Sequence, residues 1–190
     1  MRTFISINIS ESIKNITEKI QQKFKSDISQ ADHNLLRSVK WESKNKFHIT
    51  LYFIGDLNDF KLKEIDHELS DLSSKLNLNE ISFELGNINA FPDLKNPRVL
   101  MIELLNEDKK LIELSRKINS SFLKLGYEND KPFHPHITLG RIKRDRKIDL
   151  SGLKTELNSG VKFSVNEFYL MESKLTKEGS EYSVLKKFSL

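Results

Sequence analysis

The chain has 190 residues, of which 37% are hydrophobic and 31% are charged, and its net charge at pH 7 is +4. A chain of this length buries roughly 70% of its unfolded surface, so it needs neither disulfides nor a metal to fold. Its composition excludes a disordered or collagen-like protein, and its lack of cysteine excludes disulfides, thiolate zinc sites and a cysteine nucleophile. No apolar run approaches the roughly 20 residues that span a bilayer, and the first residues lack the features of a signal peptide. We therefore expect a cytoplasmic, monomeric protein without membrane contact.

Apolar residues that alternate predict strands, and apolar residues spaced by three and four predict helices. In the first half these patterns predict, in order, a strand over 3–9, a helix over 13–24, a loop over 26–35, strands over 36–41 and 47–54, a helix over 62–76 and a strand over 81–91. In the second half they predict a strand over 98–105, a helix over 111–125, a strand over 134–142, a short helix over 149–158 and strands over 161–171 and 182–188.

The order strand, helix, strand, helix, strand occurs twice, and a tetrapeptide repeats with it. His-Ile-Thr-Leu occupies 48–51 in the first half and 136–139 in the second. A duplicated unit explains both observations. We expect one α+β domain over 1–190, built as two lobes with pseudo-twofold symmetry, in which two antiparallel sheets flanked by helices face a central groove.

The repeated tetrapeptide places polar side chains on one face of each strand. Residues i and i+2 of a strand project to the same side, about 6.5–7 Å apart. His48 therefore shares a face with Thr50, and His136 with Thr138, whereas the residues between them are apolar and face the helices. The apolar set of the first strand is expected to include Phe47, Ile49, Leu51 and Phe53. Pseudo-twofold symmetry then brings two imidazoles and two hydroxyls to one cleft.

Two imidazoles and two hydroxyls in one cleft suit the hydrolysis of a phosphodiester. The reaction needs a base that deprotonates water and an acid that protonates the leaving oxygen, on opposite sides of phosphorus. Histidine serves either role near neutral pH, and hydroxyls donate to the non-bridging oxygens, so no metal is required. A duplication kept only for core packing explains the repeated Ile and Leu, but it does not explain the repeated His and Thr.

The chain resembles the 2H phosphoesterases, and among them the RNA 2′,3′-cyclic phosphodiesterases once named 2′-5′ RNA ligases. The resemblance covers nearly the whole chain and rests on the segments RTFISI at 2–7, FHITLYFIG at 47–55, Phe-Pro at 91–92, PRVL at 97–100 and PHITLGR at 135–141. The chain departs from many relatives at Met101 and Glu103, where they have a tryptophan and a glycine. This departure affects which side chains lie at the margin of the groove, and therefore which base or partner the protein prefers.

The resemblance implies a role for each matching residue. His48 is the proton donor to the leaving ribose oxygen, and His136 is the proton acceptor that activates water. Thr50 and Thr138 hold the phosphate, and the guanidinium of Arg141 forks onto phosphate oxygens. Strict alternation places Arg141 on the apolar side of its strand, so its role requires that the strand end or that a bulge redirect it.

Three further features lie near the two motifs. His134 shares a face with His136, and it lines the cleft near the phosphate in preference to binding a metal, for which no third ligand is evident. Tyr52 shares the face of His48, where it stacks on a base, closes the groove or has a plain structural role. The basic run 143–147 is a solvated loop or an attraction for an RNA backbone.

We therefore expect an enzyme that opens the terminal 2′,3′-cyclic phosphate of RNA or oligonucleotides without metal or cofactor. The resemblance implies a 2′-phosphomonoester product and weak reverse joining of RNA ends through a 2′-5′ linkage. Two alternatives stay open: a 2H enzyme that acts on a small cyclic nucleotide-type phosphate, and a module that binds RNA ends without turnover.

Overall fold

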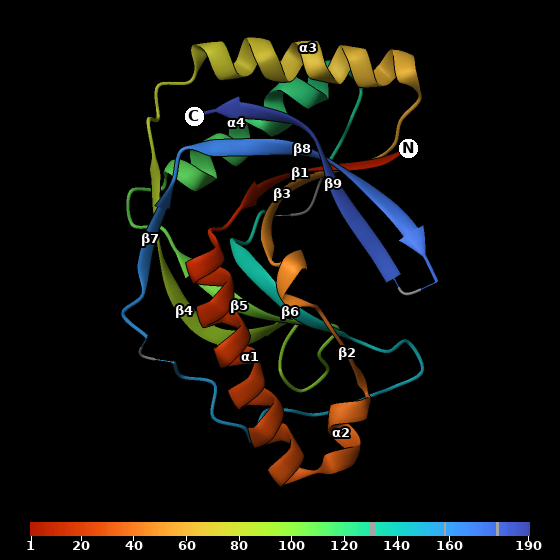
Figure 1. Ribbon diagram of the computed structural model, residues 1–190, viewed down its shortest axis with the longest axis vertical. Coiled ribbons are helices and arrows are strands. Elements are labelled where there is room, and N and C mark those ends of the chain that lie inside the picture. The colour runs from red at the N-terminus through yellow and green to blue at the C-terminus, as the bar shows by residue number, and fades with distance from the viewer. Residues whose placement is uncertain (130–131, 158, 178) are drawn as a thin grey trace.

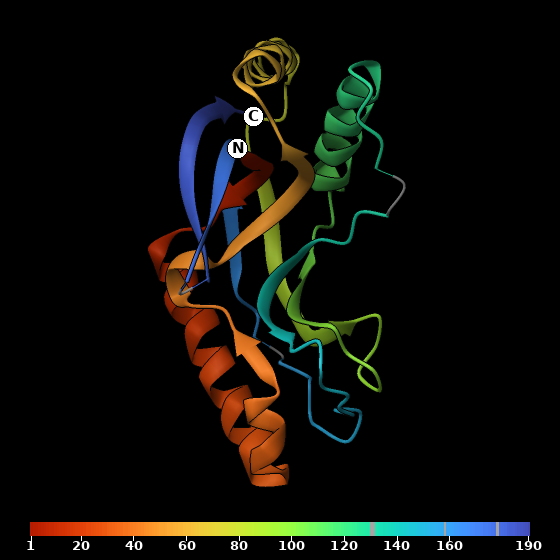
Figure 2. The same ribbon diagram turned by 90° about the vertical axis from the view of Figure 1, so that its right-hand side faces the viewer.

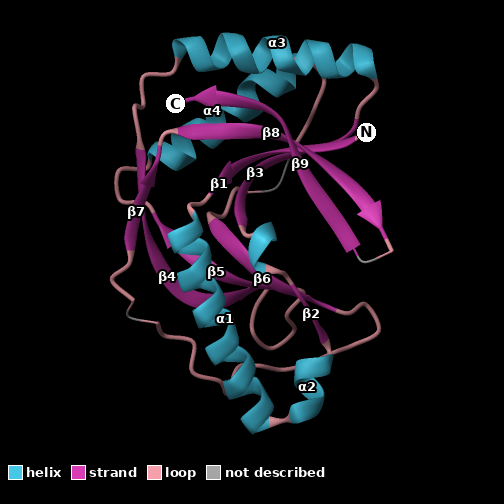
Figure 3. Ribbon diagram, viewed as in Figure 1, coloured by secondary structure: helices cyan, strands magenta, loops and turns pink. Residues whose placement is uncertain are grey.

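The chain forms two antiparallel sheets with helices packed against them (Figures 1 and 3). This computed structural model describes residues 1–129, 132–157, 159–177 and 179–190. The four-stranded sheet has the order β3 (His48–Asp56), β1 (Arg2–Asn8), β8 (Glu167–Thr176), β9 (Gly179–Ser189). The five-stranded sheet has the order β2 (Val39–Trp41), β6 (His136–Ile142), β5 (Val99–Leu105), β4 (Ile81–Phe91), β7 (Lys162–Val165).

The two sheets repeat one arrangement, as the duplicated sequence predicts. The order β3-β1-β8-β9 corresponds to β6-β5-β4-β7, and in each case a helical excursion connects the central strand to the strand that carries the repeated tetrapeptide. The strand β2 has no counterpart in the four-stranded sheet and extends the other sheet beyond β6. The expected α+β fold with pseudo-twofold symmetry is confirmed, and β2 marks where the symmetry ends.

The helices gather at opposite ends of the molecule (Figures 1 and 2). α3 (Asp59–Lys75) and α4 (Lys110–Lys124) lie at one end, and α1 (Glu11–Ala31) runs toward the other end, where it meets α2 (His33–Arg37). A single 3₁₀ turn, η1 (Lys44–Lys46), leads into β3. No helix among the described residues is long and apolar enough to cross a membrane.

A buried glutamine ties α1 to the five-stranded sheet. Gln21 is 2% exposed, and its Nε2 donates to the carbonyl oxygens of Glu42 and Leu139, at 2.8 Å each. Because an unpaired amide would be costly at such a buried position, these two bonds fix how α1 lies against β6. The carbonyl of Leu139 belongs to the second copy of the repeated tetrapeptide, so α1 from the first half supports the strand of the second.

Buried side chains form one continuous hydrophobic cluster through both sheets. The largest fully buried members come from both halves of the chain and include Phe24, Phe47, Phe122 and Phe168. Burying an aliphatic or aromatic side chain of this size stabilises a fold by roughly 1.5–3 kcal/mol. The shared core therefore holds the two sheets in a fixed relation.

Three predicted boundaries are wrong, each because tertiary contacts override local pattern. The predicted loop over 26–35 is helical, since α1 continues to Ala31, and Asp32 caps α2 by accepting from Asn34 N at 2.8 Å. The predicted helix over 149–158 is absent from its described part, 149–157, because its backbone bonds instead join other segments, such as Ile88 N to Thr155 O at 2.9 Å. The predicted strand over 161–171 divides into β7 and β8, which belong to different sheets.

Candidate active site

A cavity of about 440 Å³ lies where β3 of one sheet contacts β6 of the other. This volume lies within the usual range for small-molecule sites, roughly 300–1,000 Å³. The lining combines polar groups with aromatic and aliphatic side chains: Thr50, Leu51, Tyr52, Phe53, Phe91, Val99, Met101, Asn129, Pro132, Phe133, His134, His136, Thr138 and Arg141. Thr50 of the first tetrapeptide thus borders the same cavity as His136 and Thr138 of the second, whereas His48 is not one of the lining residues.

The two histidines of the repeated motif are held in the same way. The Nδ1 atom of His48 lies 2.7 Å from the carbonyl oxygen of Lys46, and the Nδ1 atom of His136 lies 2.7 Å from the carbonyl oxygen of His134. Because a carbonyl oxygen only accepts, Nδ1 carries a proton in both rings. Each neutral ring therefore carries its lone pair at Nε2, where it can take up a proton.

Burial holds both imidazoles in the neutral form in the free protein. It lowers the pKa of His48 from 6.5 to about 4, although the hydrogen bond to Lys46 opposes the shift, and the charges of His136 and Arg141 lower it further. Burial also lowers the pKa of His136, again against its backbone hydrogen bond, and Arg141 adds to the effect. The two rings therefore lie close enough to influence each other's titration.

Two aromatic rings enclose His48. Its ring centroid lies 5.2 Å from that of Phe4 on β1 and 5.3 Å from that of Tyr182 on β9. These rings exclude water from His48, which explains the lowered pKa. Tyr182 lies 134 positions along the chain from His48, and no local sequence pattern indicates that it reaches the site.

Thr50 joins His48 to the cavity. The Nε2 atom of His48 lies 3.0 Å from Oγ1 of Thr50. Because Nδ1 holds the ring proton, the hydroxyl of Thr50 donates to Nε2 when His48 is neutral. Protonation at Nε2 reverses this bond and frees the hydroxyl proton for a ligand oxygen.

A β-bulge brings Arg141 to the face of His136 and Thr138. Thr138 pairs with Met101 and Gly140 with Leu100, so Leu139 is the extra residue of the bulge. Beyond the bulge the alternation changes phase, and Arg141 borders the cavity half-exposed. Its Nε lies 3.9 Å from Oε1 of Glu42, a weak ion pair. The structure thus supplies the bulge that Arg141 requires.

The same bulge in β3 corrects the predicted faces of Tyr52 and Phe53. Thr50 pairs with Ser6 and Tyr52 pairs with Ile5, so Leu51 is the extra residue. Tyr52 turns toward the core, where it is 3% exposed. Phe53, expected on the apolar face, is 65% exposed on the face of Thr50. The expectation that Tyr52 shares the face of His48 is therefore wrong, although Tyr52 borders the cavity from the core side.

The core position of Tyr52 follows from its contact with α4. Its ring packs edge-on against Phe122, with 5.0 Å between the ring centroids. Its hydroxyl is buried and has no hydrogen-bond partner among the described residues. A polar atom in that state lowers stability, so the ring is the part of Tyr52 that the fold uses.

The aromatic end of the cavity is a feature that the sequence analysis missed. Phe91 is 57% exposed and lines the cavity together with Phe53, Phe133 and Met101. Exposed aromatic rings beside a polar cluster are typical of sites that hold a flat, partly polar ligand. Of the two positions that depart from many relatives, Met101 lines this end, and Glu103 accepts from Nδ2 of Asn89 at 2.7 Å.

His134 lies where expected, at the cavity wall, and its carbonyl oxygen orients His136. Within the described part of the chain, no three histidine, aspartate or glutamate side chains gather in a way that would hold a metal ion. The polar groups that converge on the cavity are imidazoles, hydroxyls and one guanidinium, a set that suits an anionic ligand better than a cation.

A model of the 2′-5′ RNA ligase superfamily matches residues 30–177. This chain belongs to that superfamily. Its relatives include proteins named RNA 2′,3′-cyclic phosphodiesterase from Methanocaldococcus jannaschii, with 30% identity over 99% of this chain and 100% of the relative, and from Archaeoglobus fulgidus, with 31% identity over 99% of each.

Solved structures agree with this assignment. A protein of Thermus thermophilus shares 26% identity and superposes with a TM-score of 0.81, covering 100% of this chain and 98% of the other. LigT of E. coli, at 22% identity, superposes with a TM-score of 0.75 over 100% of this chain and 97% of the other. The two-lobed arrangement of this superfamily member is therefore a fold found in solved structures, as the sequence resemblance predicts.

Proposed function

We propose that this member of the 2′-5′ RNA ligase superfamily hydrolyses the terminal 2′,3′-cyclic phosphate of RNA or oligonucleotides to a 2′-phosphomonoester. The observation that carries the proposal is the matched pair of histidines, each with Nδ1 bonded to a carbonyl oxygen and with the lone pair of the neutral ring at Nε2. The names of the relatives that align over the full chain support the substrate class. A site that only binds phosphate needs no such pair.

The two imidazoles divide the proton transfers between them. Nε2 of His136 accepts a proton from water while the water oxygen attacks phosphorus. Nε2 of His48 donates its proton to the ribose 3′ oxygen as the bond from phosphorus to that oxygen breaks. After one turnover His136 holds the extra proton and His48 is neutral, and exchange with solvent restores both rings. Because the acid and the base are both side chains, we propose that the reaction requires no metal.

Substrate binding favours the protonated form of His48 that the mechanism needs. In the free protein the pKa of His48 is about 4, so the ring is neutral at pH 7. A bound phosphodiester brings one negative charge next to the ring and favours the imidazolium form, which raises the pKa. The acid is thereby charged mainly when a phosphate is in place.

The remaining polar groups hold the phosphate between the two rings. The hydroxyls of Thr50 and Thr138 donate to its non-bridging oxygens, and the guanidinium of Arg141 neutralises the charge that develops there. His134 lines the same wall. The exposed ring of Phe53 stacks on the terminal base, the role that the sequence analysis considered for Tyr52. The same groups would join RNA ends weakly through a 2′-5′ linkage when the 5′ hydroxyl of a second RNA replaces water as the nucleophile and the 3′ oxygen again leaves phosphorus.

The test is the incubation of a short RNA ending in a 2′,3′-cyclic phosphate with the protein in excess EDTA. Mass spectrometry and phosphorus NMR identify the product. We expect a 2′-phosphate, and we expect His48→Ala and His136→Ala each to slow its formation by roughly 10²–10⁴-fold. His67→Ala is the matched control, because His67 lies on α3 between Asp66 and Glu68, away from the cavity.

The other outcomes of this test separate the alternatives. Turnover of a cyclic mononucleotide without turnover of the RNA would indicate an enzyme for small cyclic phosphates. Binding of the RNA without any product under single-turnover conditions would indicate a module that captures RNA ends. Activity that disappears in EDTA and returns with a divalent cation would contradict the metal-independent mechanism.

A further inference from the structure

Two lysines outside the cavity meet beside the active site. Lys40 lies on β2 directly opposite Arg141 of β6, and Lys46 ends η1, two residues before His48. A Cβ built on Gly179, at the β8–β9 turn, would lie 3.3 Å from Nζ of Lys40 and 3.7 Å from Nζ of Lys46. The two ammonium groups are therefore within about 7 Å of each other, as the sum of those two distances requires.

Within the described part of the chain, Lys40 and Lys46 have no carboxylate partner, unlike the cations next to them. Lys44 pairs with Glu11, and Arg141 contacts Glu42. Among the residues that the structure describes, no carboxylate lies within 4.0 Å of either Lys40 or Lys46. Like charges directly opposite each other on neighbouring strands, such as Lys40 and Arg141, are destabilising. An anionic ligand would remove that cost.

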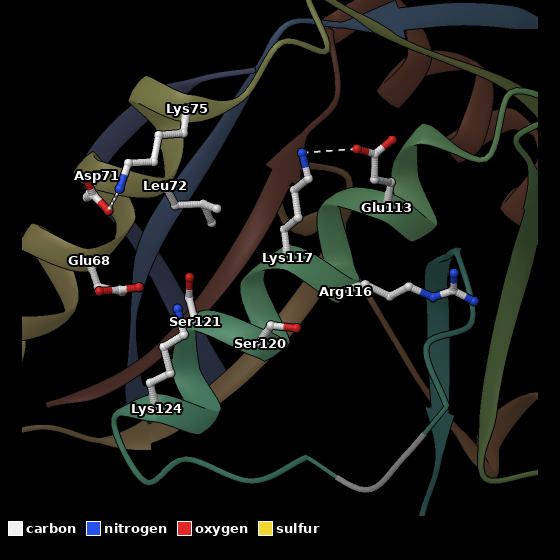
Figure 4. A pocket seen from close by; sticks show the side chains of 10 residues that line it. All are labelled: Glu68, Asp71, Leu72, Lys75, Glu113, Arg116, Lys117, Ser120, Ser121 and Lys124. Atoms are coloured by element: carbon white, nitrogen blue, oxygen red, sulfur yellow. Dashed lines mark hydrogen bonds and ion pairs between the residues drawn. The ribbon is translucent and has the colours of Figure 1, made fainter.

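Basic residues elsewhere on the surface are arranged differently. The groove between α3 and α4 contains Lys75, Arg116, Lys117 and Lys124 (Figure 4). There Lys75 pairs with Asp71 at 2.6 Å and Lys117 with Glu113 at 3.0 Å. Internal carboxylates already balance half of these cations, so a count of basic side chains alone does not mark an anion site. This groove supplies a control surface instead.

We propose that Lys40 and Lys46 bind a phosphodiester of the RNA chain on the 5′ side of the terminal cyclic phosphate. This inference rests on the proposed function and narrows its substrate class from any cyclic phosphate to the end of an oligonucleotide. Lys40 pairs with Arg141 across neighbouring strands, and Lys46 precedes His48 by two residues, so both lysines are anchored next to residues of the site. A chain that leaves the cavity on this side passes over the two ammonium groups.

The symmetry of the fold explains why the RNA takes this direction. The strand β2 and its Lys40 belong to the five-stranded sheet alone, and η1 enters only β3. Neither β2 nor η1 has a counterpart among the described elements of the other lobe, so the fold places Lys40 and Lys46 on one side of the site. The terminal base lies toward the exposed Phe53 and Phe91, and the rest of the chain extends toward β2.

The test compares two substrates in the double variant K40Q/K46Q. The substrates are 2′,3′-cyclic AMP and a hexanucleotide that ends in the same cyclic adenosine. In K40Q/K46Q, we expect kcat/KM for the hexanucleotide, divided by kcat/KM for 2′,3′-cyclic AMP, to fall about tenfold at low salt. The slope of log kcat/KM for the hexanucleotide against log salt should become shallower by about 0.7 for one lost phosphate contact. K40R/K46R should restore the ratio, and K75Q/K124Q, with the same loss of charge in the α3–α4 groove, should not change it.

An unchanged ratio and salt slope in K40Q/K46Q would overturn the proposal, as would an equal fall for both substrates, which would indicate a structural role. If the wild-type protein opens neither substrate, the proposed function fails, and binding decides the lysine subsite separately. Fluorescence anisotropy of a labelled hexanucleotide would then show weaker, less salt-dependent binding by K40Q/K46Q if the subsite is correct. Equal binding by both proteins would refute it.

Discussion

The strands β3 and β6 share the same β-bulge but have different side chains after it. Each begins with His-Ile-Thr-Leu, each has its bulge at the leucine, and in each the residue five positions after the histidine is exposed on the cavity side. That residue is Phe53 in one lobe and Arg141 in the other. The duplication therefore kept the histidines and threonines alike. Under the proposed function, the two lobes divide recognition between a ring on one side and a cation on the other.

The two lobes also differ one position earlier, where Tyr52 corresponds to Gly140. The ring of Tyr52 packs against Phe122 on α4. A Cβ at Gly140 would lie 2.8 Å from Cγ1 of Val39 and 3.1 Å from the carbonyl oxygen of Lys40, both on β2. The extra strand thus explains why one lobe has a large ring where the other has no side chain.

The largest effects on ligand binding in this comparison are expected from substitution of Phe53 and of Arg141. Arg141→Gln should raise the Ki of both 2′-AMP and inorganic phosphate by roughly 10–100-fold, because a bond to a charged group contributes about 1.5–3 kcal/mol. Phe53→Ala should raise the Ki of 2′-AMP by a comparable factor, since stacking contributes about 1–3 kcal/mol per base, but should have little effect on inorganic phosphate.

Competitive inhibition measured with both ligands separates the two roles. Phe60→Ala is the matched control, because Phe60 is a 76% exposed ring on α3, away from the cavity. Equal effects of Phe53→Ala on both inhibitors would show that Phe53 supports the site as a whole and does not recognise the base.

The pH dependence of the reaction tests whether one histidine is protonated and the other neutral during turnover. Burial lowers the pKa of both, to about 4 for His48, so both are neutral above pH 6.5 in the free protein. The reaction needs one proton on the pair. We therefore expect kcat/KM to be greatest below pH 6.5 and to fall about tenfold per unit above the higher pKa. The maximum of kcat should lie at higher pH, because a bound phosphate raises both values.

A pH–rate series with a cyclic mononucleotide gives both curves. The unfolded chain protonates His48 between about pH 6.5 and 4 and the folded chain does not, so the fold loses stability as the pH falls through that range. Circular dichroism at each pH therefore accompanies the kinetics. A flat profile between pH 5 and 9 would contradict the two-histidine mechanism.

The smallest effects concern stability at Tyr52 and Gly140. Gly140→Ala should lower the free energy of unfolding by about 1–3 kcal/mol, because β2 leaves no room for a methyl group. Tyr52→Phe should change it by less than about 0.5 kcal/mol or raise it, since the hydroxyl has no partner among the described residues. Urea unfolding measures both changes.

Gly152→Ala is the control for the glycine substitution, because nothing lies within 4 Å of a Cβ at that position. A Gly140→Ala protein as stable as the control would show that β2 can move away. The difference between the lobes would then not depend on crowding by that strand.

Period-two alternation predicted the shared faces of His48 with Thr50 and of His136 with Thr138, because both pairs precede the bulges. It failed for Tyr52 and Phe53, which follow one. A bulge leaves no mark in a run as uniformly apolar as Leu51–Ile54. At Arg141 the mismatch between charge and expected face indicated that the strand ends or that a bulge redirects it, and the structure has the bulge.

Local sequence patterns could not predict the contacts between distant segments of the chain. Tyr182 on β9 encloses His48, and the β8–β9 turn approaches Lys40 and Lys46. Both depend on how β9 lies in its sheet, which pairing across the whole chain determines. Likewise the segment after Ile148 has apolar residues but forms one local turn, from Leu153 N to Leu150 O, and bonds otherwise to β4 and to Leu94.

The most direct measurement compares an oxygen and a sulfur leaving group in the two histidine variants. A cyclic phosphate whose 3′ bridging oxygen is replaced by sulfur expels a thiolate, which needs no proton. We predict that His48→Ala loses roughly 10²–10⁴-fold with the oxygen substrate but regains nearly the wild-type rate with the sulfur substrate, whereas His136→Ala stays slow with both. If sulfur rescues His136→Ala, or rescues both variants equally, the assignment of His48 as acid and His136 as base is wrong.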